Sequence, residues 1–191
     1  MCIRDRVTEY VLATVVFLFV LAGLFSWLVT YLLPEEYKKV QYILVPCMAY
    51  PLFYTLSETT VVGLGINRKS SYAMIASLIA VVVNLIGNFL LVPKYGAAGA
   101  SVSTAVAFWV FLVCRTEFSC LTWRQIPRVK LYSVTFACLL ASVATPFLGS
   151  NHSSMVTSAW ILICIVSLYL FKPSLIAAKS EFKRQIQSQK K

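Results

Sequence analysis

Charged residues are scarce in this sequence. They make up 13% of the 191 residues, whereas 59% of the residues are hydrophobic. Soluble domains carry about 25% charged residues, because they present a polar surface to water. A chain of this composition instead fits a lipid environment, which runs of about 20 apolar residues can cross. The composition therefore predicts an integral membrane protein.

Patterns typical of metal, disulfide and catalytic sites are also lacking. The single histidine, His152, has no second histidine or cysteine pair nearby, and the cysteines show no Cys-x-x-Cys spacing. The sequence contains no HExxH, no Gly-x-Ser-x-Gly and no pair of carboxylates suited to acid–base chemistry. We therefore expect no metal, no cofactor and no enzyme, and we interpret the cysteines as small buried hydrophobic residues.

Six apolar runs follow one another with almost no amphipathic periodicity, which favours membrane spans over the buried helices of a soluble domain. The first three are long enough to span with tilt, and the last three are near the lower end of the spanning range. The runs cover residues 10–33, 42–64, 72–92, 97–113, 131–148 and 155–171. The sequence thus predicts an all-α integral membrane bundle of six transmembrane helices.

The net charge of +10 is carried by residues between and after these runs. This distribution is typical of topology signals and lipid-headgroup contacts, and it argues against nucleic acid as a partner. Six crossings place most of the basic residues on one side of the membrane, and this side is expected to be cytoplasmic. That side holds Arg68, Lys69, Arg115, Arg124, Arg128, Lys130 and the tail, whereas the other holds Lys38, Lys39 and Lys94.

The two ends of the chain have separate interpretations. Residues 1–6, Met-Cys-Ile-Arg-Asp-Arg, resemble translated sequencing-adapter sequence, so we expect them to be an artefact that precedes a fragment without its true N-terminus. Residues 7–172 are predicted to hold the six spans. Residues 173–191 are predicted to form a basic cytoplasmic tail, with both ends of the fragment in the cytoplasm.

Glu58 is the only acidic residue well inside a predicted span, and its burial in lipid would be costly enough to indicate function. Tyr54 and Tyr50 precede it by four and eight residues, so the three form one stripe. Glu58 could face a cavity near mid-membrane and bind a coupling proton or Na⁺, or shape the cavity's potential. It could instead be a structural carboxyl. Pro46 and Pro51 interrupt the same helix, as expected for one that flexes in alternating access.

Asn84 and Asn88 share one face of the third span, because they are four residues apart. An unpaired amide is costly in lipid, so this face must contact protein or water. Interhelical hydrogen bonds and direct substrate contact are both open interpretations. Pro93 is expected to end the span and Gly96 to permit a tight reversal. The next run begins with small residues that allow close helix packing, namely Gly96, Ala100, Ser103, Thr104 and Ala107.

The segments GINRKSSY, NLIGN and LVPKYGAAGASVSTA resemble the polysaccharide flippases of the multidrug/oligosaccharidyl-lipid/polysaccharide exporter superfamily. Members commonly show a Gly followed by basic residues, an Asn-x-x-x-Asn span, and Pro-x-Tyr-Gly-x-x-Gly-Ala with a small residue and Thr. Gly99 and Thr104 match this pattern, whereas Gly87 stands where the family often has Leu. The motifs cover residues 65–105. The six spans are compatible with one lobe, the C-terminal half, of the family's twelve-span fold.

The resemblance implies a bacterial inner-membrane protein that moves lipid-linked oligosaccharide, usually on undecaprenyl diphosphate, from the cytoplasmic to the outer leaflet. An N-terminal lobe of the same protein would rock against this one about a central cavity. Arg68 and Lys69 are candidates for contact with the diphosphate, or plain topology anchors. The nearest alternative is a cation-coupled multidrug exporter, followed by a membrane glycan polymerase or ligase and by a structural scaffold. We expect Glu58→Gln to lower surface glycan more than Glu117→Gln.

Overall fold

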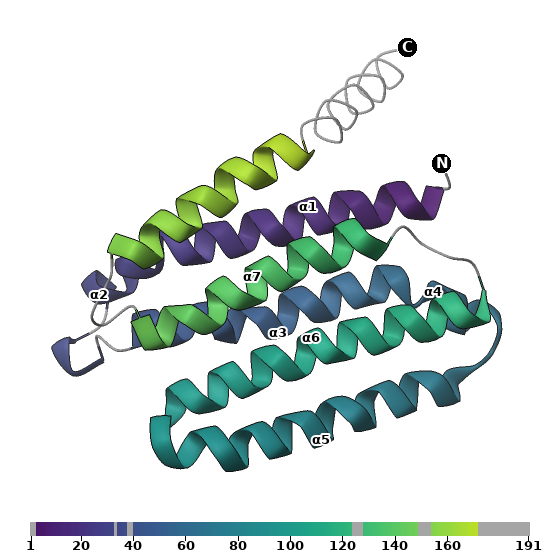
Figure 1. Ribbon diagram of the computed structural model, residues 1–191, viewed down its shortest axis with the longest axis horizontal. Helices are drawn as coiled ribbons and strands as arrows, with labels where there is room; N and C mark the ends of the chain where they lie inside the picture. Colours follow the sequence, from purple (N-terminus) through teal and green to yellow (C-terminus); the bar gives the residue numbers. More distant parts are fainter. Residues whose placement is uncertain (1–2, 33, 38–39, 124–127, 149–153, 172–191) are drawn as a thin grey trace.

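The computed structural model describes residues 3–32, 34–37, 40–123, 128–148 and 154–171. Within these ranges the chain forms helices and no strand, which confirms the predicted all-α class for this part of the chain (Figure 1). The elements in chain order are α1 (Ile3–Leu24), η1 (Ser26–Leu28), α2 (Val29–Leu32), η2 (Glu35–Tyr37), α3 (Val40–Thr60), α4 (Val62–Ile66), α5 (Ser70–Tyr95), α6 (Ala97–Thr122), α7 (Arg128–Leu148) and a last helix, Ser154–Phe171.

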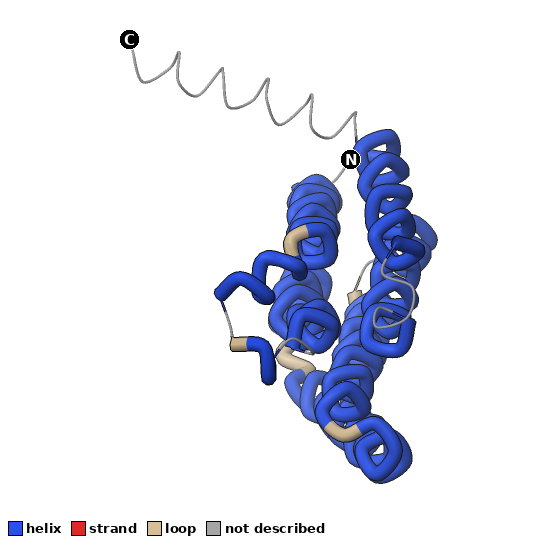
Figure 2. Tube along the Cα trace, turned by 90° about the vertical axis from the view of Figure 1, so that its left-hand side faces the viewer, coloured by secondary structure: helices blue, strands red, loops and turns tan. Residues whose placement is uncertain are grey.

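The long helices run side by side in one bundle, which Figure 2 views nearly along the helices. Helix α6 packs against α3, α5 and α7, and α3 also packs against α1 and α7. The main apolar core therefore lies among α1, α3, α6 and α7, and α5 covers the outer side of α6 (Figure 1). The largest fully buried hydrophobic side chains of this core are Trp160, Phe19, Phe53, Leu56 and Leu112.

Five described helices are long and apolar enough to cross a membrane, and they correspond to five of the six predicted spans. The sixth prediction falls on α3, which has 21 residues but lower hydropathy than these five. Its sequence contains two prolines, three tyrosines and a polar stretch that includes Glu58, and these residues lower its hydropathy. Helix α3 nevertheless lies inside the bundle with one buried face. Its crossing of the membrane stays a prediction.

Two predicted runs are interrupted where the sequence suggested one span each. Helix α1 ends at Leu24, and the rest of run 10–33 forms the short elements η1 and α2. Run 42–64 breaks at Val61 between α3 and α4. The break places Glu58 in the last turn of α3, and its position near mid-membrane stays a prediction. Long runs of apolar residues concealed these breaks, because hydropathy is insensitive to a change in backbone direction.

Two other helices extend beyond their predicted ends. Helix α6 continues to Thr122, so Arg115 lies within the helix and not in the following loop. Helix α5 continues through Pro93 to Tyr95, and the prediction that Pro93 ends the span is wrong by two residues. The reversal itself is at Gly96, as predicted, with φ of +57°, a conformation that favours glycine.

Helices α5 and α6 form a closely packed hairpin in which two glycines remove steric obstacles. A Cβ atom added at Gly99 would lie 2.5 Å from the backbone oxygen of Leu91. A Cβ atom added at Gly87 would collide with the side chain of Ser103, whose own Cβ would be 3.0 Å away. Small residues therefore allow the close approach that the sequence predicted, and the residues buried at the contact are Gly99 and Ser103.

The contact between Gly87 and Ser103 can be tested by a compensating pair of substitutions. Gly87→Ala alone should lower the stability of the full-length protein in detergent by about 1–2 kcal/mol, because the added methyl group overpacks the contact with Ser103. In a Ser103→Gly background, Gly87→Ala should cost less than it does in the wild-type protein, because the side chain that it contacts is gone. Unfolding of the two single variants and the double variant would measure this difference. Simple additivity of the two losses would show that the residues are not in contact.

Trp160 lies inside the bundle and joins three helices. It is fully buried, its ring stacks on Phe19 with centroids 6.5 Å apart, and its Nε1–H donates to the Thr145 hydroxyl at 3.4 Å. The last helix is thereby fixed against α1 and α7. Residues 1–2, Lys38, Lys39, His152 and the predicted tail at 173–191 lie outside the described residues.

Candidate functional site

Tyr50, Tyr54 and Glu58 form the predicted stripe on α3. All three side chains are partly exposed on the face opposite the residues that α3 buries in the core. The buried face recurs every three or four residues and includes Val45, Leu52 and Leu56 among others. The helical period therefore separates a packing face from a polar aromatic face, as the spacing indicated.

A groove of about 340 Å³ lies between α3 and α5, with α6 contributing the third wall. It brings together three of the candidate residues, Tyr50, Tyr54 and Asn84, from two helices that are distant in sequence. We call it the aromatic groove. Its lining consists of Tyr50 and Tyr54 from α3, Ser77, Ala80, Val81 and Asn84 from α5, and Ala107, Phe108 and Phe111 from α6. Mostly apolar walls with a few polar groups are typical of small-molecule sites.

Four aromatic rings of the groove form a row of two neighbouring pairs, because Phe108 also lies 5.8 Å from Phe111. Tyr50 lies 4.4 Å from Phe108 and 6.4 Å from Tyr54, measured between ring centroids. Tyr54 in turn is stacked almost parallel to Phe111, with centroids 6.1 Å apart. The two tyrosines retain partly exposed faces or edges. The row provides flat apolar surface with hydroxyl groups at its edge.

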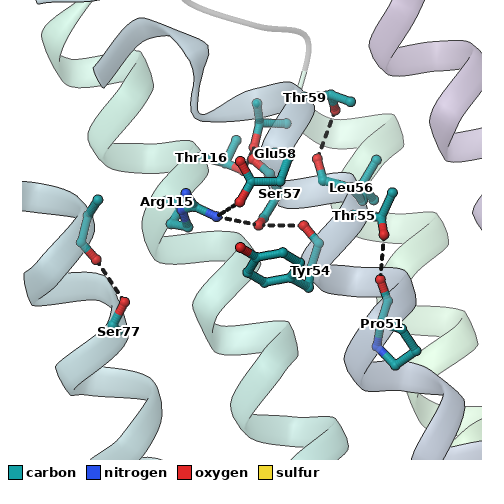
Figure 3. Close-up of polar contacts among 12 residues, drawn as sticks. Pro51, Tyr54, Thr55, Leu56, Ser57, Glu58, Thr59, Ser77, Arg115 and Thr116 are labelled. Atoms are coloured by element: carbon teal, nitrogen blue, oxygen red, sulfur yellow. Dashed lines mark hydrogen bonds and ion pairs between the residues drawn. The ribbon is translucent and has the colours of Figure 1, made fainter. Parts of the chain in front are cut away.

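Arg115 of α6 lies at one end of this row and pairs with Glu58 (Figure 3). Its Nη1 donates to the Glu58 Oε1 at 2.7 Å and to the Ser57 hydroxyl at 2.9 Å. The guanidinium carbon is 4.9 Å from the ring centroid of Phe111 and 5.9 Å from that of Tyr54. Glu58 therefore has a cationic partner and is not an isolated carboxyl.

The sequence interpretation missed Arg115, because it ended the apolar run at residue 113 and assigned the arginine to a loop. A signal was present in the residues that follow. Phe118, Cys120 and Leu121 continue the apolar character, and no glycine or proline occurs before Pro127. This pattern indicates that the helix extends past Arg115. Its partner could not be predicted, because Glu58 is 57 residues away.

Asn84 and Asn88 take part in the hydrogen bonds that join α5 to α6. The Asn88 Nδ2 donates to the Asn84 Oδ1 at 3.2 Å, and the Ser103 hydroxyl lies within hydrogen-bond distance of both oxygens of Asn84, at 2.9 and 3.0 Å. This arrangement favours the interhelical interpretation of the pair. Asn84 also lines the aromatic groove, whereas Asn88 does not appear in its lining. The buried Asn88 Oδ1 has no hydrogen-bond partner among the residues that the structure describes.

Arg68 and Lys69 lie in the exposed turn between α4 and α5 and are absent from the lining of the aromatic groove. Arg68 has a positive φ of +53°. The preceding Asn67 donates through Nδ2 to the backbone oxygen of Thr122 at 2.6 Å, which ties this turn to the end of α6. The Lys69 ammonium lies 5.8 Å from the ring centroid of Tyr72. These positions suit anchors at the end of the bundle.

Two further ion pairs join helices near the same end of the bundle (Figure 1). Arg128 of α7 donates to Glu117 of α6 at 2.5 Å, and the Tyr132 hydroxyl donates to the other oxygen of Glu117 at 2.7 Å. Lys130 of α7 pairs with Glu9 of α1. Glu117 therefore has a structural role between helices, so it is a poor neutral comparison for Glu58.

The long apolar helices of the described structure define the class of protein. Comparison with family models, with curated proteins and with solved structures found no match. The five long apolar helices make the chain a multi-pass helical membrane protein. It contains a groove with aromatic walls, and two of the groove's rings, Tyr54 and Phe111, contact an arginine that is paired with Glu58.

Proposed function

We propose that this chain is one six-helix lobe of a transporter that flips lipid-linked oligosaccharide across the bacterial inner membrane by alternating access. The observation that supports the proposal is the aromatic groove, whose lining brings rings and an amide together, and the Arg115 guanidinium lies against two of these rings. A ligand that joins sugar rings to a diphosphate needs these types of group. The resemblance of residues 65–105 to polysaccharide flippases points to the same class of substrate.

Each part of the groove has a function in this proposal. The rings of Tyr50 and Tyr54 offer flat surfaces and hydroxyl groups to sugar rings, and Asn84 adds an amide. Arg115 offers a cation suited to phosphate oxygens. The second lobe would close the open side of the groove, and rocking of the two lobes would expose the site to each side of the membrane in turn. No chemical bond is broken in this cycle, so the protein acts as a carrier and not as an enzyme.

A cation-coupled multidrug exporter of the same superfamily is the second candidate, and one observation favours it. The Glu58 side chain is 46% exposed and lies one helical turn from Tyr54 on the same stripe of α3, and an exposed carboxylate there also suits an organic cation or a coupling proton or Na⁺. Loss of the full-length protein separates the two functions. A flippase mutant should accumulate the lipid-linked intermediate on the cytoplasmic side, whereas an exporter mutant should become sensitive to drugs without loss of surface glycan.

Glu58→Gln in the full-length protein should lower surface glycan to less than half of the wild-type amount, because it removes the charge that pairs with Arg115. Glu35→Gln is the matched control, since Glu35 is an exposed carboxyl in η2 near the opposite end of the bundle (Figure 1). Quantification of surface glycan at equal protein levels provides the measurement. Wild-type display by both variants would remove Glu58 from the transport site.

A further inference from the structure

Arg115 is held in a mostly buried position but uses only part of its capacity to bind anions. Its side chain is 12% exposed and lies against Phe111 and Tyr54. Guanidinium carries five N–H donors in a planar fork. The ion pair with Glu58 uses one nitrogen and one oxygen, and within the described part of the chain the buried Nε has no hydrogen-bond partner. An anion with several oxygens can therefore satisfy Arg115 more fully than Glu58 does.

Glu58 is the more exchangeable member of the pair. Its side chain is 46% exposed, so release into a polar medium costs it little, whereas a buried guanidinium without an anion is costly. The neutral contact from Arg115 to the Ser57 hydroxyl, at 2.9 Å, can persist when the carboxylate leaves. Figure 3 shows the guanidinium extending from α6 toward both residues of α3. Glu58 can therefore neutralise Arg115 when no other anion is present and leave when another anion binds.

We propose that Glu58 is a built-in competitor, which occupies the phosphate site of Arg115 until the diphosphate of a lipid-linked sugar displaces it. The inference rests on the proposed function and adds how its site is regulated. Phosphate oxygens then bind two edges of the guanidinium, while the sugars stack along Tyr54 and Tyr50. Return of Glu58 to Arg115 displaces the phosphate oxygens and so promotes release of the ligand.

Competition makes the two members of the pair act in opposite directions on affinity. Glu58→Gln removes the competing charge and should strengthen binding of a diphosphate about fivefold, a change on the scale of one partly exposed ion pair. Arg115→Gln should weaken binding by about tenfold or more, because charge-assisted hydrogen bonds are lost. A purely structural ion pair predicts the same direction for both variants, namely loss of binding through loss of stability. Tight binding with slow release also accounts for lower transport by Glu58→Gln.

The test measures binding to the full-length protein in nanodiscs with three lipid probes. The probes are undecaprenyl diphosphate linked to N-acetylglucosamine, undecaprenyl diphosphate alone, and undecaprenol. Glu35→Gln is the matched control, because Glu35 is an exposed carboxyl in η2 and is not part of the lining of the aromatic groove. Arg115→Lys keeps the charge without the planar fork, so it should bind with intermediate affinity and carries the test if Arg115→Gln fails to fold.

Tighter binding of both diphosphate lipids by Glu58→Gln, weaker binding by Arg115→Gln and Arg115→Lys, and no change for undecaprenol would support the proposal. Binding of the diphosphates that is equal in wild type and all Glu58 and Arg115 variants would overturn it and leave the proposed function standing. Wild-type protein that binds none of the diphosphate lipids would overturn both. Weaker binding by Glu58→Gln would overturn the competitor role specifically.

Discussion

Gly99→Ala is expected to separate α5 from α6 and to lower the stability of the full-length protein in detergent by about 2–3 kcal/mol. The added Cβ atom would lie 2.5 Å from the backbone oxygen and 2.6 Å from the backbone carbon of Leu91. Backbone atoms within a helix cannot move aside as a flexible side chain can. The expected loss exceeds the gain of up to about 1 kcal/mol that alanine brings to a helix over glycine. Thermal or denaturant unfolding in detergent gives the measurement.

Gly65→Ala is the matched control, because it makes the same chemical change in a helix at a position with open space. Among the described residues, apart from its chain neighbours and the backbone of its own helix, no atom lies within 4 Å of a Cβ atom added at Gly65. This variant should be as stable as wild type or slightly more stable. Because α5 supplies one wall of the aromatic groove, Gly99→Ala should also reduce transport. Equal stability of the Gly99 and Gly65 variants would show that α5 and α6 do not approach as closely as described.

Trp160→Ala is expected to cost about 3–5 kcal/mol, the range for removing a large buried aromatic side chain. The ring is fully buried, stacks on Phe19 and donates its N–H to Thr145. A Cβ atom at Gly23 of α1 would collide with the indole, so the ring fills the space against that helix closely. The substitution leaves a cavity between α1, α7 and the last helix, and stability measurements in detergent would detect it.

Two comparison variants separate the contributions of Trp160. Trp160→Phe keeps an aromatic ring against Phe19 but loses the hydrogen bond to Thr145, so it should cost less than Trp160→Ala. Trp27→Ala removes a tryptophan that is 50% exposed, and its effect should be about 1 kcal/mol or less. A loss for Trp160→Ala no larger than that for Trp27→Ala would contradict the buried position of Trp160.

The two stability predictions bear on function because the aromatic groove depends on helices held at fixed distances. The α5–α6 contact determines how far Asn84 lies from the rings of Phe108 and Phe111. The contact between α3 and α6 determines whether Arg115 reaches Glu58, and a hydrogen bond of 2.9 Å between the Thr60 and Thr116 hydroxyls supports it from the buried side. A substitution that changes either helix contact should therefore alter ligand binding, even though the substituted residue does not contact the ligand.

The sequence by itself determined the features that arise within one helix or one turn. Low charge and long apolar runs predicted the all-α class and five of the long helices, since composition alone decides whether a segment suits lipid. The helical period placed Tyr50, Tyr54 and Glu58 on one stripe. Gly96 marked the turn between α5 and α6, because few other residues adopt its backbone conformation.

The tertiary structure decided which of these local features meet. It paired Glu58 with Arg115, joined Tyr50 and Tyr54 to Asn84 in one groove, and buried Trp160. It also placed the backbone of Leu91 against Gly99. The physical reason is that hydropathy and periodicity state which face of a helix avoids lipid or water but not which neighbour covers that face. That choice depends on how side chains of several helices fit together, and no single segment of sequence contains it.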